Sequence, residues 1–590
     1  MKYYSYKNLK PTGWLEKQLE AQYQGLSGYL YKMWPDIYDS KWIGGTKEGW
    51  ERLPYYLDGF IPLVYILDKN REKNIIKSYI DTILKNQKSD GWICPTGEDE
   101  RKDYDLWALF LVLKVLVVYY EYTEDSRIEN AVYKALNNLY TLLNQKTLSN
   151  WASSRWFECL ISIAWLYERK PEPWLIELAF KLKAQGLDYL TCSNLWKESK
   201  KVWSYETHVV NISMALKAEA LFSKLTKSKQ KGDAKKLLKV LDKYNSTAYG
   251  HFTGDECLGG NSPTRGSELC GIAEAMYSYE LLFLITGDTF YLNRLDKLAF
   301  NGLPATISSS MWTHQYDQMV NQIACTKFSE NPFGTNSNES NIFGLEPNFG
   351  CCTANFHQAW PKYARSVATF DDNNIYICSP VPFSIKTNDL ELDIISEYPF
   401  RQKVIIKGKT LTPRTLKIRI PKNYKLISDL KEKNHFLSID IDFDFSVEFQ
   451  LVPLIKLEKR PSNLYCLNYG LLLFSLPINF KENMLEYTKD GIERKYPYCD
   501  YEILPTSSWN FSFIKKSDFD VVECDYDLPF DRKNPPLKIK TKLAQISWIE
   551  SSPFIPSDSP SSTRIDEDED VELQPYGSTT LRMTELPLIK

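Results

Sequence analysis

The pattern of apolar and polar residues divides the chain into a helical part and a part rich in strands. From about residue 12 to 370, apolar residues recur at steps of three and four, as in GWLEKQLEAQYQGLSGYL and AKKLLKVLDKY, which is the spacing of a helix. Short segments with Gly, Pro, Ser and Asp separate these stretches. Strands of a parallel sheet are missing between them, so we expect roughly a dozen helices, paired as hairpins in a closed ring.

The stretch from Met311 to Gly350 interrupts this rhythm. It is rich in Asn, Gly, Ser and Pro, as in FSENPFGTNSNESNIFGLEPNFG. A loop of this length inside a compact domain is usually functional or disordered. It leads directly into the vicinal pair Cys351 and Cys352, which favours a functional loop.

After about residue 370 the pattern changes to short segments with β-branched and aromatic residues, such as RQKVIIKG and HFLSIDIDFDFSVEFQL. These predict strands at the spacing of a β-sandwich. We expect a helical catalytic domain over residues 1–370, a β-sandwich domain over 371–477 and a second β-sandwich region over 478–590. The Pro-, Ser- and acid-rich segment SSPFIPSDSPSSTRIDEDED in that last region is predicted to be an exposed loop.

The charge balance and the apolar runs narrow the class of protein. The chain has 72 basic and 75 acidic residues, a net charge of −3, which speaks against nucleic-acid binding and polybasic membrane attachment. The most apolar run, Leu106 to Tyr122, is interrupted by Lys114 and is predicted to be a buried helix. The first residues lack the apolar core of a secretory signal, so we expect a cytoplasmic protein whose twelve cysteines stay reduced.

Two short segments carry the candidate chemistry. Glu268 and Cys270 stand in RGSELCG, and Cys351 and Cys352 stand in NFGCCTAN. Three thiolates and one carboxylate complete the tetrahedral ligand set that Zn²⁺ prefers. Residues two positions apart do not share a helix face, but Glu268 and Cys270 can converge at an extended helix entry, which the preceding residues 263–266 permit. From spacing alone, two unrelated groups of buried cysteines are the alternative.

At these residues the chain resembles glycoside hydrolase family 127, the DUF1680 domain, whose best-known activity is β-L-arabinofuranosidase. The resemblance rests on RGSELCGIAEAMYSYELLFLITGD, MWTHQYDQMVNQI and NFGCCTANFHQAWPKYA. It extends to GWERLPYYLDG, NYGLLLFSLPI and ELQPYGSTTLRMTELP, and so to nearly the whole chain. It implies an (α/α)6 barrel followed by β-sandwich domains, and a zinc-dependent retaining glycoside hydrolase that acts on plant-type oligosaccharides.

The resemblance also assigns roles to the motif residues. Cys351 is the nucleophile and forms a thioglycosyl intermediate. A glutamate upstream of the ELC motif is the acid/base, and Glu256 is its match, with Asp255 as the rival. These roles agree with physical chemistry, because a thiolate and an acid/base on opposite faces of a sugar give double displacement with retention. The implied zinc ligands are Glu268, Cys270, Cys351 and Cys352.

Further residues are expected to bind the substrate. His208, in ETHVVN, resembles a family histidine that binds the sugar. Two other sugar-binding histidines of the family have no match, and Ala108 and Ser154 or Arg155 stand near their places. The chain therefore matches the family at the catalytic centre and departs from it among the sugar-binding residues.

The segment that begins at Trp312 is expected to line the same cavity. Trp312, Gln315 and Tyr316 are its candidate substrate-binding residues, and the Tyr316 hydroxyl could bond to the thiolate or the sugar. Packing of these aromatic side chains at the barrel rim is the alternative.

Three other functions fit the same residues. An inverting hydrolase would use only carboxylates, with Asp255, Glu256 and Asp317 as candidates and a structural zinc. A polysaccharide lyase would use His208 or Tyr316 as its base. A carbohydrate-binding protein would have no turnover, and fold alone does not decide among them. The expected partner is an oligosaccharide, with no nucleic acid and no membrane, and a homodimer is one assembly that we consider.

Overall fold

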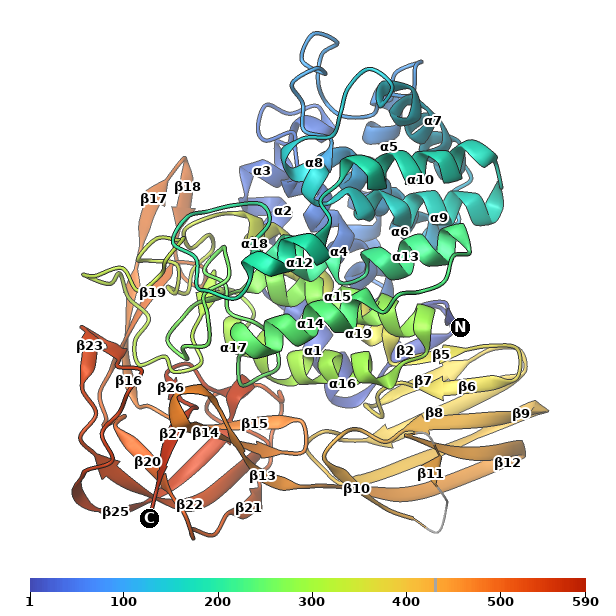
Figure 1. The fold of residues 1–590 in the computed structure, drawn as a ribbon. Helices are drawn as coiled ribbons and strands as arrows, with labels where there is room; N and C mark the ends of the chain where they lie inside the picture. Colours follow the sequence, from blue (N-terminus) through green and yellow to red (C-terminus); the bar gives the residue numbers. More distant parts are fainter. Residues whose placement is uncertain (429–431, 434) are drawn as a thin grey trace.

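The computed structural model describes residues 1–428, 432–433 and 435–590. Helices occupy most of the chain up to residue 366, and strands dominate after it. Figure 1 shows the helical region above the strand-rich region. The predicted order of a helical region followed by β structure is therefore confirmed.

The helices differ in how much of their surface is buried. Most residues of α4, α6, α12 and α15 are buried, whereas α5, α7 and α14 bury one face and expose charged residues on the other. A helix that is apolar all round belongs in a core, and an amphipathic helix belongs at the surface. The longer helices are α1 (Gly13–Gln24), α4 (Arg52–Ile66), α5 (Asn70–Asn86), α6 (Trp107–Thr123), α7 (Arg127–Leu142), α9 (Cys159–Arg169), α10 (Pro173–Gln185), α12 (Val209–Ala215), α13 (Ala218–Thr226), α14 (Asp233–Tyr244), α15 (Leu269–Thr286), α16 (Thr289–Lys297) and α19 (Ala359–Ser366).

Neighbouring helices contact one another in a closed order. Helix α4 contacts α6, α6 contacts α9, and α9 contacts α13; the order continues through α15 and α19 back to α4. These helices therefore surround one hydrophobic core. The shorter helices are α2 (Leu30–Met33), α3 (Pro35–Tyr38), α8 (Asn150–Ser154), α11 (Tyr189–Cys192), α17 (Leu303–Thr306) and α18 (Cys351–Asn355).

Ionised side chains in this core are paired. Nζ of Lys114 lies 2.8 Å from Oδ2 of Asp58, and Nζ of Lys362 lies 2.7 Å from the same oxygen. Lys217 pairs with Glu158 in the same interior. A buried charge is tolerated when it has a close partner. This pairing explains how Lys114 fits within the buried helix α6 that the sequence predicts.

One helix among the described residues, α15, is long and apolar enough to cross a membrane by length and composition. Within the protein, 72% of that helix is buried against its neighbours. Its apolar side chains are therefore part of the core of the helical region.

The first β-sheet joins both ends of the helical region. Strands β1 (Lys2–Tyr3) and β2 (Leu9–Pro11) pair with β5 (Ala368–Phe370) and β7 (Phe383–Lys386), respectively. Residues 2–11 thus belong to the sheet that follows the helices, although the sequence places them in the helical domain. The other strands of this sheet are β6 (Asn374–Ile377), β8 (Leu390–Ser396), β9 (Lys403–Arg419), β10 (Tyr424–Ile427), β11 (Glu432–Lys433) and β12 (Phe436–Pro453).

The second β-sheet takes up strands from both sides of the expected boundary at residue 477. Strand β14 (Leu464–Tyr469) pairs with β27 (Leu586–Ile589), and β15 (Leu472–Pro477) pairs with β25 (Arg564–Pro575). The change of sheet falls directly after β12, because alternation along a strand does not say which sheet the strand joins. The remaining strands of this sheet are β13 (Ile455–Lys459), β20 (Phe511–Ile514), β21 (Asp520–Glu523), β22 (Leu537–Ile546) and β26 (Arg582–Met583).

The acidic segment predicted as an exposed loop is partly a strand. Its second half, RIDEDED, begins β25, which pairs with β22. The acidic side chains stay exposed, and farther along β25 Glu572 lies 2.7 Å from Lys538 of β22. Opposite charges on paired strands stabilise the pair, which allows such a polar run to form a strand.

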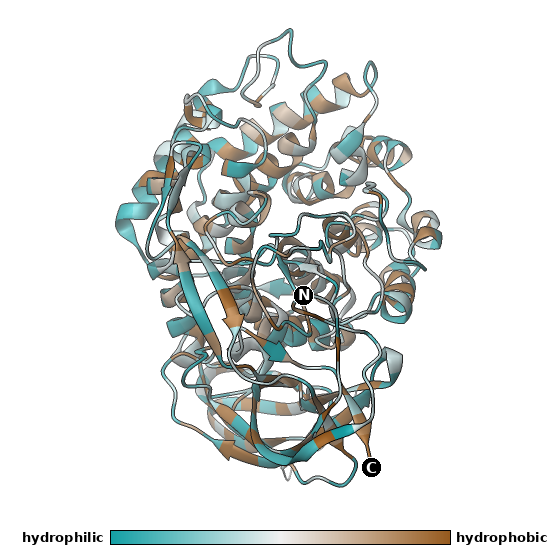
Figure 2. Cartoon of the chain, turned by 90° about the vertical axis from the view of Figure 1, so that its left-hand side faces the viewer, coloured by the Kyte–Doolittle hydropathy of each residue, from teal (hydrophilic) through white to brown (hydrophobic). Residues whose placement is uncertain are grey.

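Two hairpins stand beside the helical region. In Figure 1 they rise on the left toward α18, and Figure 2 views the molecule from that side, with hydrophilic and hydrophobic residues alternating along strands. They consist of β16 (Phe480–Leu485) with β19 (Asp500–Pro505) and β17 (Tyr487–Lys489) with β18 (Ile492–Arg494).

These hairpins hold the long loop of residues 311–350. The backbone of β19 forms bridges to that loop between Tyr501 and Phe343 and between Ile503 and Cys325. The buried side chain of Arg494 lies 3.0 Å from Glu346. The loop is therefore fixed by the β region as well as by the helices.

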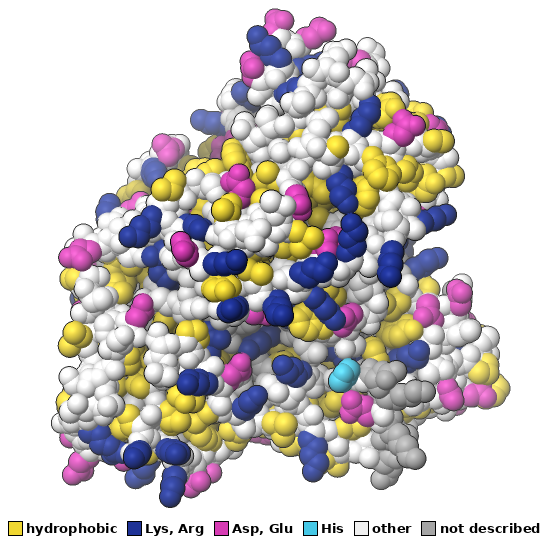
Figure 3. Space-filling view, in the orientation of Figure 1, with side chains coloured by type: hydrophobic (Ala, Val, Ile, Leu, Met, Phe, Trp, Pro, Cys, Tyr) yellow, Lys and Arg dark blue, Asp and Glu magenta, His cyan; other side chains and the backbone are white. Residues whose placement is uncertain are grey.

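The surface carries no large region of a single charge on the face shown in Figure 3. Basic and acidic side chains lie among apolar ones over both the helical and the β region. This mixture agrees with the small net charge of −3.

Candidate active site

Four motif residues lie at the beginnings of two helices. Glu268 ends β3 (Ser267–Glu268), which pairs with β4 (Asp317–Gln318), and its backbone is extended, with φ −68° and ψ 133°. Helix α15 begins at the next residue, so Cys270 lies in its first turn. The vicinal cysteines begin α18 after a turn in which Asn348 has φ +64°. The helix entry expected from the sequence at Glu268 and Cys270 is thus present.

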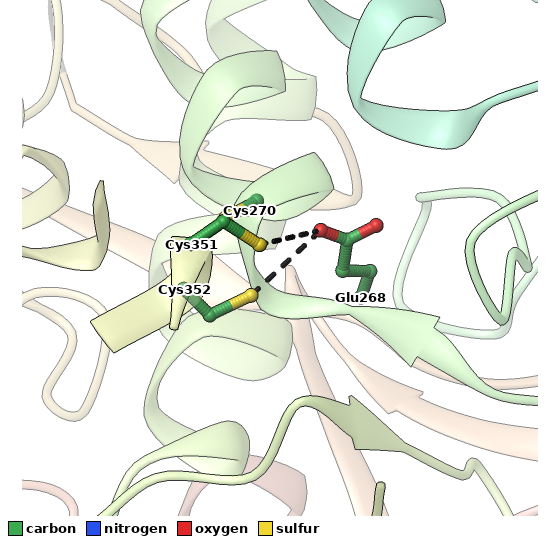
Figure 4. Close-up of side chains that lie close together, drawn as sticks. All are labelled: Glu268, Cys270, Cys351 and Cys352. Carbon is green, nitrogen blue, oxygen red and sulfur yellow. Dashed lines mark hydrogen bonds between the residues drawn. The ribbon is translucent and has the colours of Figure 1, made fainter. Parts of the chain in front are cut away.

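Glu268, Cys270, Cys351 and Cys352 form one compact cluster. One potential ligand atom from each residue lies within 4.8 Å of all the others. Sγ of Cys351 and Sγ of Cys352 lie 3.8 and 3.7 Å from Oε1 of Glu268, the two contacts drawn in Figure 4. Cys351 is partly exposed, and the other three residues are buried.

The electrostatics of this cluster fit a cation. Burial, together with the charges of Glu256 and Cys351, raises the pKa of Glu268, and burial also raises the pKa of Cys270 and Cys352. Oε2 of Glu268 is buried and has no hydrogen-bond partner among the described residues. Crowded acidic groups with an unpartnered oxygen are stabilised by a bound divalent ion, which favours their charged forms.

Cys351 differs from its neighbours. Burial raises the pKa of its thiol, but the hydrogen bonds and the positive charge around it together outweigh burial and hold the pKa well below its ordinary value, with hydrogen bonds from Cys270 and Cys352 as the largest of these opposing effects. The Arg52 guanidinium lowers it further. Since the thiolate is the reactive form of cysteine, Cys351 is the strongest candidate nucleophile of the three.

Glu256 lies beside this cluster in a strained backbone conformation, with φ +138°. Its carboxylate accepts hydrogen bonds from Nε2 of His208 and Nε1 of Trp203, each at 3.1 Å, and from the Tyr316 hydroxyl. Its own carbonyl oxygen accepts from the backbone N–H of Val209 at 2.7 Å. Three side-chain donors therefore orient one carboxylate.

His208 is held in one tautomer. Nδ1 of His208 accepts a hydrogen bond from the backbone N–H of Asn211 at 3.3 Å, where the residue caps α12. The ring proton of the neutral form is thus on Nε2, which donates it to Glu256. The predicted substrate-binding histidine contacts the candidate acid/base directly.

The rival carboxylates have other partners. Asp255 pairs with Arg265 and accepts from the backbone N–H of Gly266 at 2.6 Å and of Gly334 at 2.8 Å. Burial raises its pKa, and Arg265 opposes that shift. Asp317 accepts from Asn336 at 2.8 Å. Asp255 therefore fastens loops to one another, which favours Glu256 as the acid/base.

The segment after Trp312 divides into residues that reach the cluster and residues that do not. The Tyr316 hydroxyl lies 3.2 Å from Sγ of Cys351 while it also donates to Glu256. Gln315 is fully buried, and its amide donates to Gln322 and to the carbonyl of Asn341. Its side chain points away from Tyr316 because neighbouring residues of an extended chain alternate in direction, so this geometry does not support sugar binding by Gln315.

Trp312 lies at the rim. Its ring packs between those of Tyr29 and Tyr498, with centroids 4.9 and 6.2 Å away. This is the aromatic packing that the sequence leaves as the alternative. Because the Trp312 ring is partly exposed, its contact with a substrate at the rim remains a prediction.

An aromatic wall beside Glu256 is not predicted by the sequence. Trp151 lies at its centre, with ring centroids 5.5 Å from Trp203, 5.1 Å from Tyr205 and 5.2 Å from His208. The guanidinium of Arg155 stacks 4.4 Å from the Trp151 ring. In the sequence, this wall was indicated only by Arg155, which stands near the place of a family histidine that this chain lacks. Flat aromatic faces of this kind suit sugar rings.

The family of the chain follows from a comparison of its sequence with known families. Residues 17–365 match the model described as the beta-L-arabinofuranosidase, GH127 catalytic domain. The chain belongs to glycoside hydrolase family 127. As a member of GH127 it is a glycoside hydrolase, which removes the lyase and the binding protein without turnover from the possible functions.

Solved structures share the fold of this GH127 protein. One is the GH127 β-L-arabinofuranosidase Ara127N from Geobacillus stearothermophilus T6, with 12% identity and a TM-score of 0.72 over 99% of this chain and 100% of that one. Another is the GH127 β-arabinofuranosidase BT3674, with 13% identity and a TM-score of 0.70 over 100% and 98% of the two chains. A search of curated proteins found no match.

Proposed function

We propose that this GH127 enzyme is a zinc-dependent, retaining β-L-arabinofuranosidase that acts on plant-type oligosaccharides. Cys351 would be its nucleophile and Glu256 its acid/base. We also propose that the closed order of helices from α4 to α19 is an (α/α)6 barrel, with the candidate active site at one of its mouths. The cytoplasm suits such an enzyme, since all twelve cysteines are free thiols.

The observation that carries this proposal is the position of the Tyr316 hydroxyl between Cys351 and Glu256. It bonds to the Glu256 carboxylate and lies 3.2 Å from Sγ of Cys351. Two groups that share one hydroxyl lie no more than about 6 Å apart, which is two hydrogen-bond lengths. Retaining glycosidases place their two catalytic groups about 5–5.5 Å apart, whereas inverting enzymes need about 6.5–9.5 Å to admit water.

In the proposed reaction, Cys351 and Glu256 carry out two successive steps. In the first, Sγ of Cys351 attacks the anomeric carbon, the glycosidic C–O bond breaks, and the Glu256 carboxylic acid gives its proton to the leaving oxygen. In the second, the Glu256 carboxylate takes a proton from water, the water oxygen attacks the same carbon, and the C–S bond breaks. Tyr316 and His208 hold the Glu256 carboxylate at the reacting centre in both steps.

The zinc proposal rests on the chemistry of the cluster. The ligands would be Glu268, Cys270, Cys351 and Cys352, three thiols and a carboxylate at mutual distances within 4.8 Å. A bound Zn²⁺ would keep these thiols deprotonated and offset the negative charge of the carboxylates around them.

An inverting reaction is the remaining alternative. Asp317 is buried, its Oδ1 lacks a partner among the described residues, and its pKa is raised by burial and by Asp255 and Glu256. A carboxylate pair made of Glu256 and Asp317 would then activate water directly, with the cysteines serving the metal alone.

Variants of Cys351 and Glu256 distinguish the two mechanisms. Cys351→Ser should lose about 1,000-fold or more in kcat, because an alcohol is not ionised near neutral pH. Glu256→Gln should lose most activity on natural glycosides, yet cleave an aryl glycoside with a good leaving group, and added azide should restore turnover. Activity on a panel that includes aryl β-L-arabinofuranosides, product anomer by NMR and zinc content measure these outcomes.

Cys524→Ser, in the β region, is the matched control for the cysteine change and should keep full activity. Product of retained configuration and one zinc per chain are expected. An inverted product, or azide rescue of Cys351→Ser with Glu256→Gln unaffected, would overturn the thiolate mechanism. Active protein without stoichiometric metal would overturn the zinc site.

A further inference from the structure

The two oxygens of the Glu256 carboxylate have different neighbours. Oε1 accepts a hydrogen bond from the Tyr316 hydroxyl, which also lies 3.2 Å from Sγ of Cys351. Oε2 accepts from Nε2 of His208 and from Nε1 of Trp203, each at 3.1 Å. One oxygen of the candidate acid/base is therefore linked to the candidate nucleophile through Tyr316, and the other oxygen is bonded to Trp203.

The reaction places the leaving group on the Trp203 side of this carboxylate. In the proposed double displacement, Sγ of Cys351 attacks the anomeric carbon from one face, and the glycosidic oxygen leaves from the opposite face. The Glu256 carboxyl gives its proton to that oxygen. A side chain that bonds to the carboxylate oxygen not linked to Cys351 therefore lies beside the departing part of the substrate. This step rests on the function proposed above.

Trp203 also has accessible surface at this place. The residue is 36% exposed, and its neighbour Val202 is 78% exposed. His208, the other donor to Oε2, is only 3% exposed, and Trp151 and Tyr205 of the aromatic wall are half-buried. A ring can stack on a ligand only where its surface is open. Of the two donors to Oε2, Trp203 is therefore the one that can contact a leaving group.

The loop that carries Trp203 is tied to the chain directly after the candidate acid/base. On one side of Trp203, the backbone N–H of Lys200 donates to the carbonyl of Leu258 at 2.8 Å. On the other side, the backbone N–H of Ser204 lies 3.4 Å from Sγ of Cys257. The indole ring is therefore held in place relative to the carboxylate, as a binding surface requires.

The remaining surface of Trp203 is an apolar ring. Its neighbours Trp151 and Tyr205 meet it at interplanar angles of 64° and 78°, so neither is stacked flat on it. Its indole N–H is already engaged by Glu256. What the ring can offer a ligand is therefore a flat face, which suits the C–H face of a sugar.

We propose that Trp203 forms the leaving-group subsite of this glycoside hydrolase. Its ring stacks on the sugar that departs, while its indole N–H holds Glu256 for transfer of the proton to the glycosidic oxygen. The enzyme therefore favours a saccharide leaving group over an alkyl one, because an alkyl group has no ring to stack.

A ratio of two specificity constants tests this proposal: kcat/KM for a β-L-arabinofuranosyl disaccharide divided by kcat/KM for methyl β-L-arabinofuranoside. The two substrates differ only in the leaving group. Trp203→Ala should lower this ratio about tenfold, because it removes stacking that only the disaccharide receives. Trp203→Phe keeps a ring and should hold the ratio within about twofold, although both constants fall with the lost N–H. Since both substrates meet the same enzyme, the ratio does not depend on the fraction of folded protein.

Trp174→Ala is the matched control and should leave the ratio unchanged. Trp174 lies in α10, which packs against α9 and α13, and its Nε1 also donates to a glutamate, Glu172, at 2.5 Å. An unchanged ratio in Trp203→Ala, or an equal fall in Trp174→Ala, would overturn the subsite while hydrolysis by the wild type upholds the proposed function. If the wild type instead cleaves another glycone, the proposed sugar is wrong, and the same two leaving groups on that glycone test Trp203.

Discussion

Single residues at the candidate active site give up local stability for geometry. Glu256 adopts φ +138°, a conformation that a non-glycine residue rarely takes and that costs about 1–3 kcal/mol. The structure holds it there through three side-chain donors and through its carbonyl bond to Val209. Such strain is maintained where surrounding contacts determine it, and here it aims the carboxylate at the thiol cluster.

Tyr316→Phe tests the hydroxyl that joins the two catalytic candidates. Loss of that hydroxyl removes a donor to Glu256 and a contact to Cys351, so kcat should fall about 100-fold while KM changes little. Steady-state kinetics on an aryl glycoside measures the effect. Tyr4→Phe is the control, because the Tyr4 hydroxyl is buried without a partner among the described residues and lies outside the site. Equal kinetics for the two variants would contradict this role.

For single residues, the sequence predicts the candidate catalytic groups better than it predicts the aromatic wall beside Glu256. Glu268 and Cys351 are found because they are residue types that zinc prefers and because they stand in the family motif, and the structure brings them together. Gln315 and Tyr316 are adjacent in the sequence, yet only Tyr316 reaches the cluster, since an extended chain turns successive side chains apart. Trp203 is missed because a tryptophan in a loop gives no sign of which carboxylate it will meet.

Helices, strands and loops position the site from several parts of the chain. The long loop that leads to Cys351 is bridged by β19, and its Glu346 lies 3.0 Å from Arg494 of β18. The β hairpins therefore support the loop next to the candidate nucleophile. The β region carries no cluster like that of the helical region, so we expect it to contribute more to stability than to chemistry, and this contact is one way in which it does so.

Arg494→Met should show this bracing. It leaves Glu346 without its partner and should lower the free energy of unfolding by about 2 kcal/mol. Proteolysis of the 311–350 loop should become faster, and kcat/KM should fall severalfold as α18 loses its fixed position. Lys495→Met, one residue away, removes only an exposed pair with Glu493 and is the control. If both variants were equally stable and active, the hairpin would not position the loop.

Elements are predictable where their pattern is periodic. The buried helix α6 and the helix α14 follow from hydrophobic spacing, and their positions agree with the structure. The partner of each strand is not predictable in this way, as β14 and β15 show by joining the second sheet. Pairing depends on contacts between distant segments, which local alternation does not encode.

The whole molecule is one assembly of helices on sheets. Nε1 of Trp14 in α1 donates to the carbonyl of Tyr398 at 3.0 Å, and the Trp14 ring packs against Phe400 and Phe530 of the β region. The helical region therefore depends on the sheets for part of its core, across the domain boundary that the sequence places at residue 370.

A chain that ends at residue 370 tests this dependence. It should be insoluble, because it exposes the apolar face around Trp14 and leaves β2 without its partner β7. Expression beside the full chain, with sedimentation of the soluble fraction and an activity assay, measures the outcome. Recovery of a soluble, fully active fragment would show that the helical region is independent.

The pairing of β2 with β7 also sets an order of events during synthesis. The Asn8 side chain donates to the carbonyl of Lys386, 378 positions farther along. At about 5–20 residues per second, a ribosome needs roughly 20–75 s to make that partner. Until then, residues 2–11 have no sheet to join, and the helices built meanwhile expose the surface that the sheet will cover. Rapid translation and chaperone protection of this interval should therefore decide how much of the enzyme reaches its native state.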